Sequence, residues 1–232
     1  MKLLLCLNRL SDHTSLFEQL SRQSGEELTP KPDPQSANFV FSTHYLGHEI
    51  DVCETEFGLF QTSYKTTKAL TQKRYHLALK ASFCNAYKPE LNICDIVNVI
   101  KDKPGDLGMN IGEEFQDMYD LKLTDAESFP HYKGAFINMN NSYMNVMMPF
   151  RKVVSVTVNQ YADVNTYEAK REKYKADIET GDGLGFVYAC MYERQPFYQI
   201  NCVERNLTTG LYDNEKAKKS LNDTLLDILQ KL

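Results

Sequence analysis

A short glycine-rich turn in the last third of the chain carries the residues that most suggest chemistry. Gly181-Asp182-Gly183-Leu184-Gly185 follows a predicted strand and opens a predicted helix, and Glu204 lies about twenty residues further on. The pattern imitates a dinucleotide-binding fingerprint. However, its spacing is GxGxG rather than GxGxxG, and that fingerprint normally lies in the first strand–helix turn of its domain. We therefore expect a tight turn with Asp182 at a helix start, where its carboxylate can accept hydrogen bonds from the vicinal hydroxyls of a ligand.

The cysteines and histidines are spaced in ways that argue against a metal site. The six cysteines contain no CxxC pair, and the five histidines form no HExxH motif. Several cysteines lie in apolar runs, where a free cysteine behaves as a small hydrophobic residue. The sequence therefore predicts no metal, no organic cofactor and no disulfide framework.

Composition and charge exclude several classes of partner. The 26 basic and 31 acidic residues give a net charge of −5, and the basic residues are scattered, so we expect no nucleic-acid partner. The apolar run Leu3–Leu7 is shorter than the roughly 7–15 residues of a signal peptide core and the roughly 20 of a membrane span. We predict a cytoplasmic protein with no membrane partner.

The sequence predicts one α/β domain over residues 1–232. Strands are predicted at 3–7, 39–41, 50–52, 75–79, 95–100, 153–158, 176–179 and 197–203, and helices after 11–14 and at 62–72, 166–174, 184–192 and 217–232. Such alternation predicts a sheet with helices on both faces. Residues 22–36, with three prolines, are predicted as a surface loop, and 103–150 as an irregular excursion.

Several motifs together resemble one family. They are Ile93-Cys94-Asp95-Ile96-Val97-Asn98-Val99, Asp106-Leu107-Gly108, Gly112-Glu113-Glu114-Phe115, Leu121 to Pro130, Ala176 to Asp182, Pro196-Phe197-Tyr198-Gln199-Ile200 and Leu221 to Leu225. In this combination they resemble the nucleoside phosphorylase-type nucleosidases, most of all futalosine hydrolases and also methylthioadenosine/S-adenosylhomocysteine nucleosidases. The resemblance covers most of the chain. It implies a three-layer α/β/α fold with a central mixed sheet, a purine nucleoside or purine ligand, a homodimer and, for futalosine hydrolases, a role in menaquinone biosynthesis.

The resemblance also implies a site that cleaves an N-glycosidic bond by side chains alone. Asp12 matches the acid that activates water, and Asp182 with Gly181 matches the ribose-binding pair. The proton donor's position falls on Arg205, or on Asn206 if the strand ends one residue early. The remaining substrate-binding positions that the resemblance implies are Asn159, Tyr161 and Phe83.

Three departures from the family pattern concern these same positions. Asp182 replaces a glutamate and is one methylene shorter, and Arg205 cannot donate a proton near neutral pH because the guanidinium pKa exceeds 12. A small-residue loop of the family reads Lys80-Ala81-Ser82-Phe83-Cys84-Asn85-Ala86 here, after a strand expected to end near Leu79. The chain has only 11 glycines, against about 16 expected for its length, and part of the deficit lies in this loop.

Two functions remain open at this point. One is a purine-nucleoside hydrolase of the futalosine type with impaired activity. The other is a catalytically silent relative that binds a nucleoside or a more anionic ligand through Arg205 and Lys80. A structural protein that uses only the fold's dimer face is a third possibility. The blocked loop and the arginine favour altered chemistry on a retained scaffold.

Overall fold

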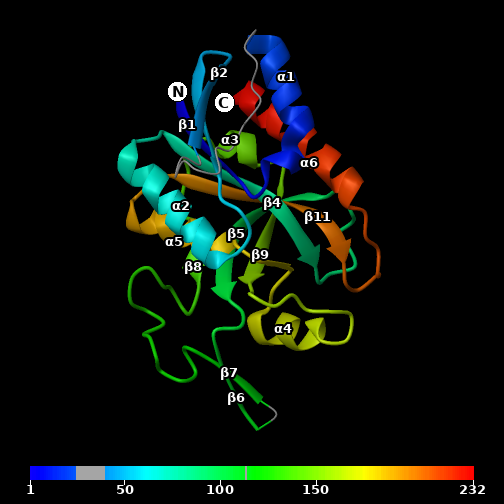
Figure 1. Cartoon of the computed structure of the whole chain (residues 1–232). Coiled ribbons are helices and arrows are strands. Elements are labelled where there is room, and N and C mark those ends of the chain that lie inside the picture. The colour runs from blue at the N-terminus through cyan, green and yellow to red at the C-terminus, as the bar shows by residue number, and fades with distance from the viewer. Residues whose placement is uncertain (25–39, 113) are drawn as a thin grey trace.

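The computed structural model describes residues 1–24, 40–112 and 114–232. In chain order the elements are β1 (Lys2–Leu7), the 3-10 helix η1 (Leu10–His13), α1 (Thr14–Ser24), β2 (Val40–Tyr45), β3 (His48–Glu54), α2 (Leu59–Gln72), β4 (Leu77–Ala86), β5 (Ile96–Pro104), β6 (Gly108–Ile111), β7 (Glu114–Asp117), β8 (Phe136–Ile137), α3 (Met144–Met147), β9 (Arg151–Thr157), α4 (Tyr167–Tyr174), β10 (Ile178–Thr180), α5 (Gly183–Tyr192), β11 (Phe197–Asn206) and α6 (Asn214–Lys231). Figure 1 shows α1 and α6 on one side of the sheet and α2 with α5 on the other, which confirms the predicted three-layer α/β fold.

Strand β1 shows why the sheet needs helices on both faces. Leu3, Leu5 and Leu7 belong to the apolar cluster that includes the buried faces of α1 and α6. Leu4 and Cys6 belong to the opposite cluster, with α2 and α5. A run of consecutive apolar residues therefore forms a strand that is buried on both sides, as its sequence predicts.

Part of the sheet closes into a ring. Nine strands of the described residues form one mixed sheet in the order β10-β9-β5-β11-β4-β1-β3-β2, with β8 on β5, and β10 also pairs with β4. The strands β4, β11, β5, β9 and β10 thus surround a small interior, while β1, β3 and β2 continue from β4 as an open sheet.

Strand β4 corrects the prediction of a loop at residues 80–86. The strand runs from Leu77 to Ala86, because Ala78–Ala86 pair with β11 and Asn85–Ala86 also pair with β10. The side chains of Lys80, Ser82 and Cys84 are buried. Polar residues inside the ring interrupt the apolar pattern by which a strand is recognised, so this half of β4 resembled a loop.

Other boundaries also differ from the predictions. The α1 helix extends to Ser24, into the segment predicted as a loop, and the rest of that loop lies outside the described residues. The predicted hairpin is confirmed as β2 and β3, and the 103–150 excursion contains β6, β7, β8 and α3. No helix among the described residues has both the length and the apolar character that a membrane crossing requires.

Candidate functional site

The turn before α5 places Asp182 at the helix N-cap, as the sequence predicts. The side chain of Asp182 is buried and makes no capping hydrogen bond. A Cβ atom on Gly181 would overlap the Phe57 ring and would lie 3.1 Å from the Tyr161 hydroxyl oxygen. Glycine is needed here because two aromatic side chains cover the backbone at close range.

The carboxylate of Asp182 is paired with a buried lysine. Lys80 Nζ lies 2.6 Å from Asp182 Oδ2 and donates a hydrogen bond to Asn8 Oδ1 at 2.7 Å. Lys80 has no exposed surface, and Asp182 is 1% exposed. We call Lys80, Asp182 and Asn8 the Lys80 cluster. It joins the end of β1, the middle of β4 and the start of α5.

Asp12 lies in η1 and is held by two cations. Arg9 Nε is 3.0 Å from Asp12 Oδ2, and Lys218 Nζ of α6 is 3.3 Å from Asp12 Oδ1. The next residue, His13, bonds through Nδ1 to Asn222 Oδ1 at 2.6 Å. Burial lowers the pKa of His13 to about 4, so this imidazole is neutral at physiological pH. The charge of Asp12 raises this pKa and the charge of Lys80 lowers it, each by less than the effect of burial.

The end of β11 contains a bulge that determines which side chain faces which way. Val203 pairs with Cys84 and Arg205 with Asn85, so Glu204 is the extra residue. Arg205 is exposed, and its guanidinium carbon lies 5.0 Å from the centroid of the Tyr212 ring.

Asn206 has its polar atoms fully engaged by the backbone. Its Nδ2 donates to the carbonyl oxygens of Lys88 and Leu91, and its Oδ1 accepts from the amides of Thr208 and Thr209. These bonds fix the turn after β11 and leave the amide no free group for a ligand. The geometry therefore favours neither Arg205 nor Asn206 as a proton donor.

The other predicted binding residues occupy three different places. Tyr161 lies with Phe57 over Gly181, with ring centroids 5.8 Å apart and planes tilted by 45°. The amides of Asn159 donate to the Asp106 carboxylate, which fixes the loop after β9. Phe83 stacks on His13 at 6.4 Å, on the side of the sheet that faces α1 and α6. The structure thus brings Gly181, Asp182 and Tyr161 together, and leaves Asn159, Arg205 and Asn206 in other contacts.

A buried carboxyl group lies under the same turn. Both oxygens of Asp102 accept from Thr157 Oγ1 at 3.0 Å, and one accepts from the Lys103 amide at 2.9 Å. Burial, together with a smaller contribution from the charge of Asp182, nevertheless raises the pKa of Asp102 to about 7. A Cβ on Gly183 would come within 2.8 Å of Asp102 Oδ2, so this turn is packed tightly against the ring interior.

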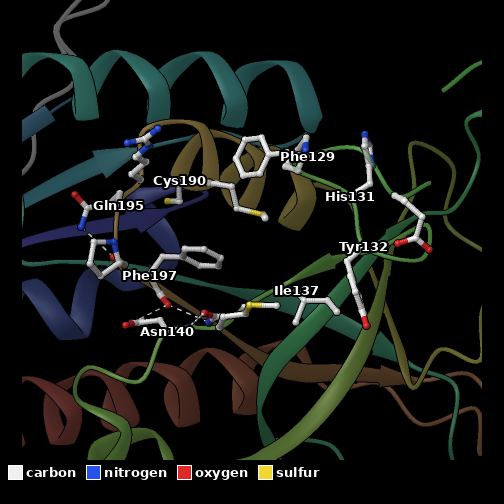
Figure 2. Close-up of a pocket in the computed structure, with 15 residues that line it drawn as sticks. Phe129, His131, Tyr132, Ile137, Asn140, Cys190, Gln195 and Phe197 are labelled. Atoms are coloured by element: carbon white, nitrogen blue, oxygen red, sulfur yellow. Dashed lines mark hydrogen bonds between the residues drawn. The ribbon is translucent and has the colours of Figure 1, made fainter. Parts of the chain in front are cut away.

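A separate cavity lies at the opposite end of α5. It has a volume of about 500 Å³ and mostly apolar walls from residues 127–140 and 190–197. Figure 2 shows Phe129 and Phe197 on opposite sides of it, with Ile137 below and Tyr132 at one end. None of the predicted site residues lines this cavity, and a ten-residue helix separates its end of α5 from Asp182 by about 15 Å. In the residues that the structure describes, no group of three or more His, Cys, Asp and Glu side chains is placed to hold a metal ion.

Sequence reasoning missed Phe57, Asn8 and His13 as neighbours of this turn, and gave Lys80 a role toward a ligand rather than toward Asp182. One signal was available. Lys80 is the only charged residue in the strand Leu77–Ala86, and a lone lysine in a buried strand requires an anionic partner. The identity of that partner depends on the pairing of β1, β4 and β10, which no local pattern encodes.

Comparison with solved structures gives full-length matches at low identity. A futalosine hydrolase mutant of Helicobacter pylori strain 26695 superposes with a TM-score of 0.79 and 14% identity, covering 100% of both chains. The Campylobacter jejuni 5′-methylthioadenosine/S-adenosylhomocysteine nucleosidase matches at 0.79 and 16%, also over 100% of both chains. The corresponding Colwellia psychrerythraea 34H nucleosidase, solved in complex with adenine, matches at 0.76 and 13%, over 100% of this chain and 96% of that one.

Neither a protein-family model nor a curated protein matches the chain. The likeness to the solved structures extends over the whole chain. This protein has the fold of the nucleoside phosphorylase-type nucleosidases, to which futalosine hydrolase and methylthioadenosine/S-adenosylhomocysteine nucleosidase belong.

Proposed function

We propose that this protein binds a purine ligand at the turn formed by Gly181, Asp182 and Tyr161 and does not hydrolyse the N-glycosidic bond of nucleosides. The shared fold supports the location, because similar structures were solved with nucleoside analogues or adenine. The observation that carries the loss of hydrolysis is the buried ion pair between Lys80 and Asp182.

The ion pair opposes the reaction in two ways. Cleavage of an N-glycosidic bond passes through an oxocarbenium-like transition state, in which the sugar carries positive charge. A buried ammonium beside the sugar-binding carboxylate repels that charge where the local dielectric is low. The ammonium also occupies Asp182 Oδ2, an oxygen that would otherwise accept a hydrogen bond from a ribose hydroxyl.

The remaining members of the expected machinery are engaged elsewhere. The Asp12 carboxylate pairs with Arg9 through one oxygen and with Lys218 through the other, so both oxygens already have cationic partners. At the proton-donor position, Arg205 lies over Tyr212, and Asn206 is bonded to backbone groups. The exposed Arg205 and the fully buried Lys80 also give no support to an anionic ligand bound between them.

The test is a product assay with three nucleosides. Purified protein is incubated with futalosine, methylthioadenosine or inosine, and free base is separated from nucleoside by liquid chromatography. We expect no base release above the enzyme-free rate, together with a rise in melting temperature on addition of purine ligands. Hydrolysis of any of the three nucleosides would contradict the proposal.

A second candidate function is hydrolysis with Glu204 as the acid. The bulge makes Glu204 the unpaired residue at this end of β11, so strand alternation no longer dictates its direction. The Glu204 carboxylate accepts a hydrogen bond from Asn214 Nδ2 at 2.6 Å, and its charge helps to raise the pKa of Tyr161, after burial and Asp182. If base release is seen, Glu204→Gln should abolish it, and Arg205→Gln, which alters an exposed neighbour, should not.

We also propose that the chain forms a cytoplasmic homodimer, on the basis of the family resemblance. Light scattering after size exclusion should then give twice the chain mass of 26.7 kDa. A monomer mass across the micromolar range would contradict this assignment. Because this measurement does not depend on ligand binding, it tests the assembly separately from the site.

A further inference from the structure

We infer that the cavity at the C-terminal end of α5 binds a small aliphatic carboxylate, and that the carboxylate pairs with Arg194. This site is independent of the proposed function, because the length of α5 separates the cavity from Asp182 by about 15 Å. The cavity volume of about 500 Å³ lies within the range of about 300–1,000 Å³ that is usual for small-molecule sites.

The cavity wall formed by residues 127–140 is held in shape by the backbone of the protein itself. The Gly134 amide donates to the Ala126 carbonyl at 3.1 Å, and β8 pairs with β5. The Asn138 amide then donates to the Ile100 carbonyl at 3.0 Å. The wall is therefore preformed, which lowers the cost of ordering the protein around a ligand.

The amide side chains of the wall are already bonded within the protein. Asn138 and Asn140 both donate through Nδ2 to the carbonyl oxygen of Phe197, at 3.0 and 3.3 Å. Gln195 Nε2 donates to two nearby backbone carbonyl oxygens, at 3.2 and 2.9 Å. Because these amides are committed to the backbone, the wall offers a ligand mainly apolar surface.

This apolar surface suits a flexible hydrocarbon chain. Figure 2 shows the cavity between Gln195 at one end and Tyr132 at the other, with Phe129 along one side. Met139 and Met191 also line it, and their unbranched side chains can adapt to the shape of a ligand. Phe129 is 64% exposed and Met139 is 75% exposed, so a hydrocarbon chain lying against them would remove apolar area from water.

The charged residues of the wall select the headgroup and its direction. Arg194 is the only lysine or arginine that lines the cavity, and its guanidinium has no hydrogen-bond or ion-pair partner within the part of the chain that the structure describes. It precedes Gln195 and so lies toward that end of the cavity. Glu127, the only acidic residue of the wall, follows the carbonyl that bonds to Gly134, which places it toward the Tyr132 end. A carboxylate is therefore attracted to one end and repelled from the other.

The experiment compares two ligands that share a hydrocarbon chain and differ in the headgroup. Decanoate and decanol are titrated into the full-length protein with isotope-labelled methionine methyl groups, and binding is followed by NMR. We expect decanoate to bind at least about threefold more tightly than decanol. The methyl signals of Met139 and Met191 should shift, and that of Met148, an exposed methionine outside the wall, should not.

Two pairs of variants separate the headgroup from the chain. Arg194→Gln should lower the affinity for decanoate to that for decanol, whereas Arg151→Gln, an exposed arginine outside the cavity, should change neither affinity. Phe129→Ala should weaken both ligands by about threefold or more, whereas Phe60→Ala, an exposed phenylalanine on α2, should weaken neither. All four side chains are exposed, so we expect circular dichroism to show an unchanged fold.

Each contrary outcome overturns a stated part of the inference. Equal affinities for decanoate and decanol overturn the assignment of a carboxylate, and binding without shifts at Met139 and Met191 overturns the location. Failure of both ligands to bind overturns the site. If Phe129→Ala then also converts a dimer into a monomer in light scattering, the cavity is part of an interface between two copies. None of these results depends on nucleosides, so they leave the proposed function untouched.

Discussion

At the scale of single residues, the Lys80–Asp182 pair links stability to the site. Both groups are buried, so removing one charge leaves the other without compensation. We expect Asp182→Asn to lower the free energy of unfolding by about 3 kcal/mol or more. Urea unfolding followed by circular dichroism measures the change.

The control for this prediction is an ion pair on the surface. Lys219 and Asp223 lie 2.7 Å apart on α6, with side chains 78% and 52% exposed. Asp223→Asn should change the free energy of unfolding by less than about 1 kcal/mol. An equal decrease in the free energy of unfolding in the two variants would show that the buried Lys80–Asp182 pair stabilises the protein no more than a surface pair does.

The buried Asp102 carboxyl predicts how stability depends on pH. Its pKa is raised from 3.8 to about 7 in the folded protein, mainly by burial. Between these two values the folded state holds a proton that the unfolded chain releases, so the free energy of unfolding falls as the pH rises from about 4 to about 7. Asp102→Asn should remove this part of the pH dependence, as seen by urea unfolding at about pH 5 and about pH 8.

His13 affects the pH dependence of the free energy of unfolding in the same direction of titration but with the opposite sign to Asp102, so the prediction must separate the two. Burial lowers its pKa from 6.5 to about 4, which makes the folded protein lose stability as the pH falls through that range. The difference between the unmodified protein and Asp102→Asn isolates the Asp102 contribution, because His13 is present in both. An unchanged pH profile in the variant would refute the role of Asp102.

Residue identities at the site were only partly predictable from the sequence. The helix start at Asp182 follows from glycine and acid placement, and the structure confirms it. The orientation at the end of β11 was not predictable, because alternation assumes regular pairing and a bulge at Glu204 breaks it. Lys80 contacts Asn8, which lies 72 residues earlier in the chain, and Asp182, which lies 102 residues later. Only the pairing of the strands brings these three residues together.

At the scale of elements, α6 depends on a specific N-cap. Asp213 Oδ1 accepts from the Lys216 amide at 3.0 Å, which satisfies one of the free amides of the first turn. Asp213→Ala should lower the free energy of unfolding by about 1 kcal/mol. Asp227→Ala, which removes an exposed pair with Lys231 at the other end of α6, serves as the matched control and should cost clearly less.

A strand or helix whose buried residues all face apolar neighbours could be predicted from the sequence. A strand that passes from apolar to polar surroundings could not. Strand β1 is apolar from Leu3 to Leu7 and α6 keeps one apolar face, so both could be identified from the residue pattern. Strand β4 begins in an apolar layer and continues into the ring, where Lys80 and Ser82 are buried among polar partners. Residues of distant strands supply the hydrogen-bond partners of these buried polar side chains, and this tertiary effect overrides the local sequence pattern.

At the scale of the whole molecule, β4 ties the open sheet to the closed ring. It pairs with β11 along one edge, and along the other edge with β1 and then, at Asn85 and Ala86, with β10. Neither part can lose its structure without breaking pairs that the other part needs. We therefore expect one unfolding transition, with coincident urea curves from circular dichroism and from the fluorescence of the 14 tyrosines, since the chain has no tryptophan. Two separated transitions would show that the ring and the open sheet unfold independently.

The same strand has a consequence for synthesis on the ribosome. The edge of β4 that pairs with β11 has no partner until β11 has been synthesised. The Ser82–Asn201 contact shows that this partner lies 119 residues later in the chain. At about 5–20 residues per second, that edge stays unpaired for about 6 to 24 s after it is translated. During this interval the nascent chain exposes a strand that is free to pair with other chains, and it is then that a holding chaperone would protect it most.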